Sequence, residues 1–85
     1  MKTFDYTIKD EMGIHARPAG LLVKEASKFV SDITIGKGEK NVDAAKIFAV
    51  LSLGVKCGET VTITADGEDE DAAIDALQTF MNDNL

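Results

Sequence analysis

Residues 13–20, GIHARPAG, contain the only histidine and the only proline of the chain, and an arginine lies between them. Proline is tolerated in the first turn of a helix, where its missing N–H leaves no hydrogen bond unmade. Pro18 therefore predicts that a helix begins directly after His15. The backbone N–H groups of Ala16 and Arg17 would then lack helical partners, and together with the helix dipole they would attract an anion.

The same field disfavours the charged imidazolium, so we expect His15 to be neutral and able to act as a nucleophile. Arg17 adds a fixed cation that can hold an oxyanion through two hydrogen bonds. These features predict a nucleophilic imidazole beside a phosphate cradle formed by Ala16 and Arg17, with Pro18 setting the geometry of the helix start. The covalent product would be a phosphohistidine.

Other interpretations of a single histidine remain open at this point. His15 could cap the helix or be an ordinary surface residue. A metal site is not expected, because the chain has no second histidine and only one cysteine, Cys57. A hydrolytic triad lacks a supporting motif such as G-x-S-x-G, and no glycine-rich phosphate-binding loop precedes a lysine and a hydroxyl residue. We therefore expect neither a metal nor a cofactor.

The elements that must position these residues follow from the pattern of apolar side chains. Residues 2–8, KTFDYTI, and 60–65, TVTITA, alternate apolar and polar side chains as strands do. Short strands are also predicted over 32–36 and 40–42, joined by a hairpin at Gly36 and Gly38. Helices are predicted over 16–29, 44–53 and 70–83.

The resulting order, βαββαβα, predicts a single domain over residues 1–85. Sequential strands joined by a tight turn and by helices favour an antiparallel four-stranded sheet with the three helices packed on one face. This is an α+β, two-layer sandwich.

The helix over 16–29 has two distinct sides at 100° per residue. The side expected to face the core contains Ala19, Leu22, Val23, Ala26, Phe29 and Val30. The opposite side contains Arg17, Gly20, Leu21, Lys24 and Lys28. Three cations on one helix face are unusual in so acidic a chain, although an ordinary solvated face would look the same.

The other two helices carry different signals. The helix over 44–53, expected to be capped by Asp43, is apolar nearly all round, so it is either wholly buried or exposes an apolar patch. Its expected inward residues are Val50 and Leu53, and those on another side are Ile47, Phe48 and Leu51. The helix over 70–83 is expected to be capped by Asp69, which makes the acidic run 68–71 a feature of capping and solubility rather than a metal site.

Composition excludes several classes of function. The net charge is −6, so nucleic acid and anionic membranes are not expected as partners. Cys57 cannot form an internal disulfide, and we expect it to be a free, partly buried thiol in a reducing compartment. The chain shows no signal peptide and no apolar run of about 18 residues, the length needed to span a membrane. A cytoplasmic location is therefore expected.

Three segments resemble one family over the whole length of the chain. GIHARPA (13–19), KIFAVLSLG (46–54) and TVTITADGEDE (60–70) are similar to the motifs of HPr, the histidine-containing phosphocarriers of the bacterial phosphoenolpyruvate:sugar phosphotransferase system. The resemblance implies an open-faced β-sandwich. It also implies a carrier, rather than an enzyme, whose His15 accepts phosphate at Nδ1 from phosphorylated enzyme I and passes it to IIA domains of sugar permeases. Arg17 corresponds to the arginine of the family that contacts the phosphate.

The resemblance further implies a partner-binding surface around the histidine on the first and second helices, on a protein that works as a monomer. Its residues in this chain are Gly20, Leu21, Lys24, Ile47, Phe48 and Leu51. Two alternatives remain: a carrier in the related nitrogen branch, and a regulatory module that docks on a transcription factor or metabolic enzyme without passing phosphate on.

One position departs from the pattern of many Gram-positive members of this family. Where those proteins have a serine that a dedicated kinase phosphorylates, this chain has Lys46. A lysine cannot form the phosphoserine and reverses the local charge, so we expect the kinase-controlled corepressor role to be absent. Lys46 would instead extend the cationic rim made by Arg17 and Lys24.

Overall fold

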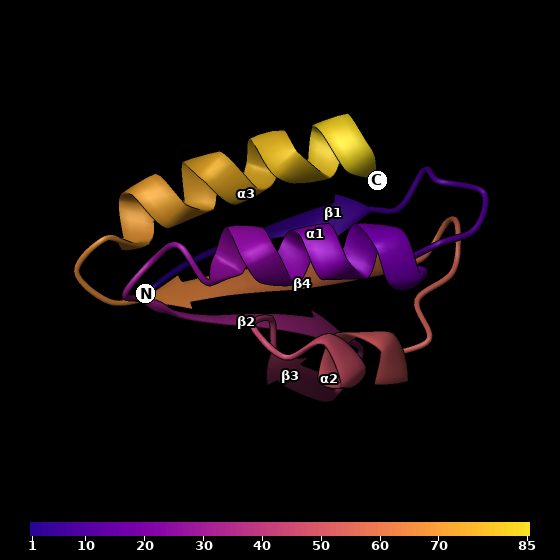
Figure 1. The fold of residues 1–85 in the computed structure, drawn as a ribbon, viewed down its shortest axis with the longest axis horizontal. Coiled ribbons are helices and arrows are strands. Elements are labelled where there is room, and N and C mark those ends of the chain that lie inside the picture. Colours follow the sequence, from indigo (N-terminus) through magenta and orange to yellow (C-terminus); the bar gives the residue numbers. More distant parts are fainter.

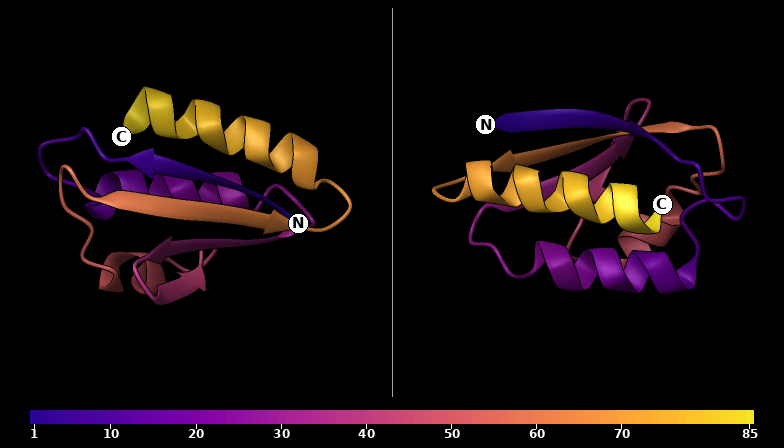
Figure 2. Two further views of the ribbon diagram at one scale, coloured as in Figure 1. Left: turned by 180° about the vertical axis from the view of Figure 1, so that it is seen from behind. Right: turned by 90° about the horizontal axis from the view of Figure 1, so that it is seen from above.

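The computed structural model describes residues 1–85 as one four-stranded antiparallel sheet and three helices. The sheet order is β1-β4-β2-β3, and the helices cover one face while the other face stays open (Figures 1 and 2). This arrangement confirms the predicted α+β, open-faced β-sandwich. The elements are β1 (Lys2–Thr7), α1 (Ala16–Ala26), β2 (Asp32–Lys37), β3 (Lys40–Asp43), α2 (Ile47–Ser52), β4 (Thr60–Asp66) and α3 (Glu70–Asn84).

The core lies between the sheet and the two longer helices. In β4, apolar side chains alternate with threonines, so that only the apolar ones face this core. Val61, Ile63 and Ala65 are fully buried, whereas the threonines between them face the open side of the sheet. From α1 and α3, Leu22 and Leu77 meet this surface with no exposed area. Apolar burial is the dominant stabilising contribution to folding. This one cluster therefore holds α1 in place, together with the start of the helix directly after His15.

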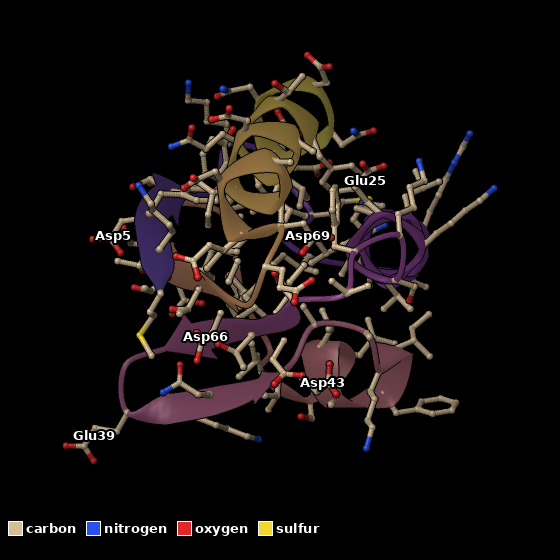
Figure 3. The ribbon with its side chains drawn as sticks, turned by 90° about the vertical axis from the view of Figure 1, so that its left-hand side faces the viewer. Asp5, Glu25, Glu39, Asp43, Asp66 and Asp69 are labelled. Carbon is tan, nitrogen blue, oxygen red and sulfur yellow. The ribbon has the colours of Figure 1, made fainter.

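Helix α1 ends at Ala26 rather than at residue 29, because a contact from elsewhere in the chain redirects the backbone. Both oxygens of the Asp69 carboxylate accept backbone N–H groups, from Val30 and Ser31, each at 2.9 Å. Figure 3 shows Asp69 between the start of α3 and the end of α1. The prediction that Val30 belongs to the core is also wrong, since it is 78% exposed.

Asp69 stands at the N-cap of α3, as predicted, but its side chain makes no bond to its own helix. It instead ties α3 to the segment after α1. The hydrogen bond from the Ser31 hydroxyl, followed by those from the backbone of Val30 and Ser31, lowers the pKa of this carboxyl below its ordinary value of 3.8.

We expect Asp69→Asn to lower the free energy of unfolding at neutral pH, because the charged acceptor of these bonds is lost. A lowered pKa in the fold means that the carboxylate stabilises fully above its ordinary pKa and loses this effect as pH falls through the lower, folded value. The difference between wild type and variant in urea unfolding should therefore shrink below about pH 4. Glu68→Gln, at an exposed neighbour, is the control. A difference that is the same at neutral and acidic pH would contradict this account.

Helix α2 begins at Ile47, three residues later than predicted. Asp43 ends β3 and does not cap the helix, because its carboxylate accepts the N–H of Ala45 at 2.8 Å in a tight turn. Lys46 takes the N-cap position instead, without a side-chain capping bond. Lys46 and Phe48 thereby come to lie at the exposed start of a short helix.

Two further findings concern the whole chain. None of the helices has the length and apolar character that crossing a membrane requires. The Cys57 thiol is exposed, not partly buried as predicted, because it lies in the turn before β4.

Candidate functional site

His15 is the N-cap residue of α1, with extended backbone angles of φ −97° and ψ −176°. Its carbonyl accepts the N–H of Ala19 at 3.0 Å, the first bond of the helix. The N–H groups of Ala16 and Arg17 donate to no atom of the chain, and Pro18 has no N–H to donate. Two unpaired donors therefore lie directly beside the imidazole, where the helix dipole also favours negative charge.

The loop before His15 is fixed by long-range backbone bonds. The N–H of Ile14 donates to the carbonyl of Val55 at 3.0 Å, and the Ile14 side chain is buried. Gly13 adopts φ +66°, and a Cβ at this position would lie 2.2 Å from the Val55 oxygen. Only glycine allows so close an approach with this backbone conformation, so the loop presents His15 from a defined position.

The connection that supports this loop has its own internal bonds. Glu59 accepts the backbone N–H of Lys56 at 2.7 Å and pairs with the Lys37 ammonium at 3.3 Å. The backbone bond first, and then the lysine, lowers the pKa of the Glu59 carboxyl. In Figure 1 this connection, the loop after β1 and the start of α1 lie together at one end of the molecule.

The imidazole opens into a small hollow and is about one-third exposed. Arg17 lines the hollow, is exposed and forms no ion pair, so its guanidinium is free to meet an anion. The hollow is lined by Asp10, His15, Arg17, Pro18, Leu21 and Asn84. Sequence reasoning missed Asp10, whose carboxylate Oδ2 lies 3.6 Å from His15 Nε2, and Asn84, which comes from the far end of the chain.

An apolar surface continues from the hollow across α1 and α2. Phe48 is 82% exposed and Leu21 is 43% exposed, so the second helix does expose an apolar patch. Gly20 faces the second helix, because a Cβ there would lie 3.7 Å from Ile47 Cδ1, an ordinary packing distance. The remaining predicted residues fit around this contact: Ile47 and Leu51 are half-buried, and Lys24 is exposed.

Charge is distributed unevenly around this surface. Arg17, Lys24 and Lys46 are exposed and form no ion pairs with the chain. The opposite end of the molecule, which faces the viewer in Figure 3, presents carboxylates that include Asp43, Asp66 and Asp69.

Sequence reasoning also missed the exposed Met12, three residues before the histidine, because an isolated apolar residue in a loop gives no periodic signal.

Comparisons with known proteins agree over nearly the whole chain. Residues 2–83 match the family model described as the PTS HPr component phosphorylation site. The phosphocarrier protein HPr of Mycoplasma capricolum subsp. capricolum is 47% identical over 83 residues, which cover 98% of this chain and 93% of that protein. A solved mycoplasma histidine-containing phosphocarrier protein superposes with a TM-score of 0.93 at 46% identity, covering 96% of this chain and 93% of the other.

A crystal structure of an HPr dimer from Thermoanaerobacter tengcongensis is also similar, with a TM-score of 0.78 and 44% identity. The match covers 98% of this chain and 95% of the Thermoanaerobacter chain. The matches reach from β1 to α3, and the family model includes the segment that contains His15. The chain therefore belongs to the HPr family, the phosphocarrier proteins of the phosphotransferase system.

Proposed function

We propose that this chain accepts a phosphoryl group on His15 from phosphorylated enzyme I and passes it to IIA domains of sugar permeases in the cytoplasm. The observation that carries the proposal is the placement of the imidazole beside two unpaired N–H groups and an unpaired arginine at a helix start. Family membership supports enzyme I and the IIA domains as partners.

The geometry suits a carrier that must release what it binds. The phosphoryl oxygens would accept the N–H groups of Ala16 and Arg17 and the guanidinium of Arg17. A helix dipole contributes about 0.3–1 kcal/mol at an exposed site, which is enough to bias transfer without trapping the phosphate. The partly exposed ring is accessible to a donor and later to an acceptor, as a relay requires.

A two-stage transfer experiment tests the proposal. The chain is phosphorylated with enzyme I and phosphoenolpyruvate, separated from both, and then mixed with a IIA domain. We expect phosphate to leave this chain and appear on the IIA domain. A regulatory module that only docks would bind its partner and keep any phosphate, and that outcome would contradict the relay. Faster phosphorylation by the enzyme I of the nitrogen branch would assign the carrier to that branch instead.

The second part of the proposal is that the surface over α1 and α2 binds these partners. It has an apolar centre at Leu21 and Phe48 and a cationic rim at Arg17, Lys24 and Lys46. Such a surface allows brief docking with several acidic partners, because apolar contact supplies affinity and charge speeds encounter.

We expect Phe48→Glu to weaken binding to enzyme I about 30-fold, because an exposed aromatic at the centre of an interface contributes more than its neighbours. The new carboxylate also opposes acidic partners. Titration calorimetry or the KM for phosphorylation measures the effect, and unfolding by urea should be unchanged. Val30→Glu, at an equally exposed apolar residue away from the proposed surface, is the matched control. Equal losses in the two variants would refute the assignment of this surface.

We further propose that the kinase-controlled modification is absent, since Lys46 occupies the serine position. Incubation with ATP and the kinase that phosphorylates Gram-positive family members should add no phosphate, as read by intact mass. Phosphate on Ser52, the nearest hydroxyl of α2, would overturn this expectation. The Ser52 hydroxyl donates to the Ala49 carbonyl at 2.6 Å within the helix.

A further inference from the structure

We propose that Asp10 is a positioning residue that holds the His15 ring with its proton on Nε2 and its lone pair on Nδ1. The proposal rests on the proposed phosphoryl transfer. Family membership already implies Nδ1 as the accepting nitrogen, and the proposal assigns the residue that prepares the ring for it. It starts from one contact, in which Asp10 Oδ2 lies 3.6 Å from His15 Nε2.

Hydrogen bonds to the backbone and to the side chain of Asp10 fix the position of its carboxylate. Its backbone N–H donates to the carbonyl oxygen of Leu85 at 3.0 Å, and its own carbonyl accepts the N–H of Gly13 at 2.9 Å. Within the side chain, Oδ1 accepts the N–H of Met12 at 2.9 Å. One oxygen is therefore committed to the loop. The second oxygen, Oδ2, is left to face the imidazole.

A carboxylate beside a ring nitrogen decides which tautomer is favoured. A negative oxygen is attracted to an N–H and repels a lone pair, so the proton of neutral His15 belongs on Nε2. Nδ1 then carries the lone pair, and it makes no capping bond to the helix. At 3.6 Å the contact is longer than a hydrogen bond, so its effect on the free ring is electrostatic.

The same contact suits the ring after it reacts. The bond between donor and phosphorus breaks with its electron pair staying on the donor, and the Nδ1 lone pair forms the new bond to phosphorus. The proton stays on Nε2, so the ring becomes positively charged and no proton has to move. Asp10 then faces a cation, while Arg17, the only other charged side chain lining the hollow, is left for the phosphoryl oxygens.

Asp10→Asn tests this directly. The amide oxygen can keep the bond from the Met12 N–H, and this turns the amide NH₂ toward His15. A donor facing Nε2 favours the lone pair there and the proton on Nδ1. We expect the ring-nitrogen chemical shifts of His15 in NMR to change from the Nε2–H form in wild type to the Nδ1–H form. Phosphorylation by enzyme I should slow by about 10- to 100-fold, by analogy with the loss of the partner that orients a metal-bound histidine.

Glu11→Gln is the matched control, because it removes the same charge from an exposed neighbour that does not line the hollow. We expect this variant to keep both the tautomer and the rate. A wild-type ring protonated on Nδ1, or an Asp10→Asn ring still protonated on Nε2, would overturn the proposal. Phosphorylation of the Asp10→Asn variant by enzyme I at the wild-type rate would also overturn it. Failure of wild type to accept phosphate would refute the relay alone, because the tautomer is measured without any donor.

Discussion

His15→Ala is expected to lower phosphorylation by enzyme I and phosphoenolpyruvate by more than about 1000-fold, to an undetectable level. The reason is that, in the proposed relay, the imidazole supplies the bond-forming atom, whereas the unpaired N–H groups of Ala16 and Arg17 would only stabilise the oxygens of the group that it binds. No second histidine exists in the chain to take over. Intact mass spectrometry after a fixed incubation measures the effect.

The variant should otherwise resemble wild type. His15 is partly exposed and its side chain makes no capping bond, so its loss should leave the free energy of unfolding within about 0.5 kcal/mol of wild type. Binding to enzyme I should persist, because the proposed partner surface over α1 and α2 is intact. Phosphorylation of His15→Ala at the wild-type rate would mean that the acceptor lies elsewhere.

Gly13→Ala is expected to have the largest effect on stability, about 2–5 kcal/mol of unfolding free energy. A Cβ at this position would lie 2.2 Å from the Val55 oxygen and 2.8 Å from Lys56 Cα, both backbone atoms that cannot rotate away. The residue also has φ +66°, which disfavours a side chain. Relief of the clash must move the loop that carries His15, so phosphorylation should slow as well. Urea unfolding and the rate with enzyme I measure the two effects.

Gly38→Ala separates the two causes. Gly38 has nearly the same backbone angle, φ +62°, but nothing lies within 4 Å of its would-be Cβ. The free energy of unfolding of this variant should fall only by the cost of the left-handed conformation, about 1–2 kcal/mol. Its phosphorylation should be normal. Equal destabilisation of the two variants would show that the contact with Val55 carries no strain.

The features that the sequence predicted correctly are those encoded by near neighbours. Pro18 predicts the helix start beside His15, alternation predicts the core face of β4, and the two glycines around Lys37 predict the β2–β3 hairpin. The helix positions of Phe48 and Val50 separate an exposed side from a buried one, as the pattern indicated. Each of these depends on residues within a few positions of one another.

The incorrect or missing predictions depend on residues far apart in the chain. Asp69 ends α1 early from a distance of almost 40 residues, and no local pattern contains that bond. Asp43 looked like a helix cap, yet the same carboxylate closes a turn equally well. Asp10 reaches His15 only because the carbonyl of Leu85 and the loop bond at Gly13 fix its backbone.

Whether His15 carries the phosphate can be decided by locating the phosphoryl group on the protein. Wild-type protein is incubated with enzyme I and phosphoenolpyruvate, and the added phosphate is then located by fragment mass spectrometry and exposed to acid and to base. We expect one phosphoryl group within residues 13–20, on His15, that is lost in acid and retained in base, as is typical of a phosphorus–nitrogen bond. An acid-stable phosphate, or one on a serine, threonine or tyrosine, would contradict it.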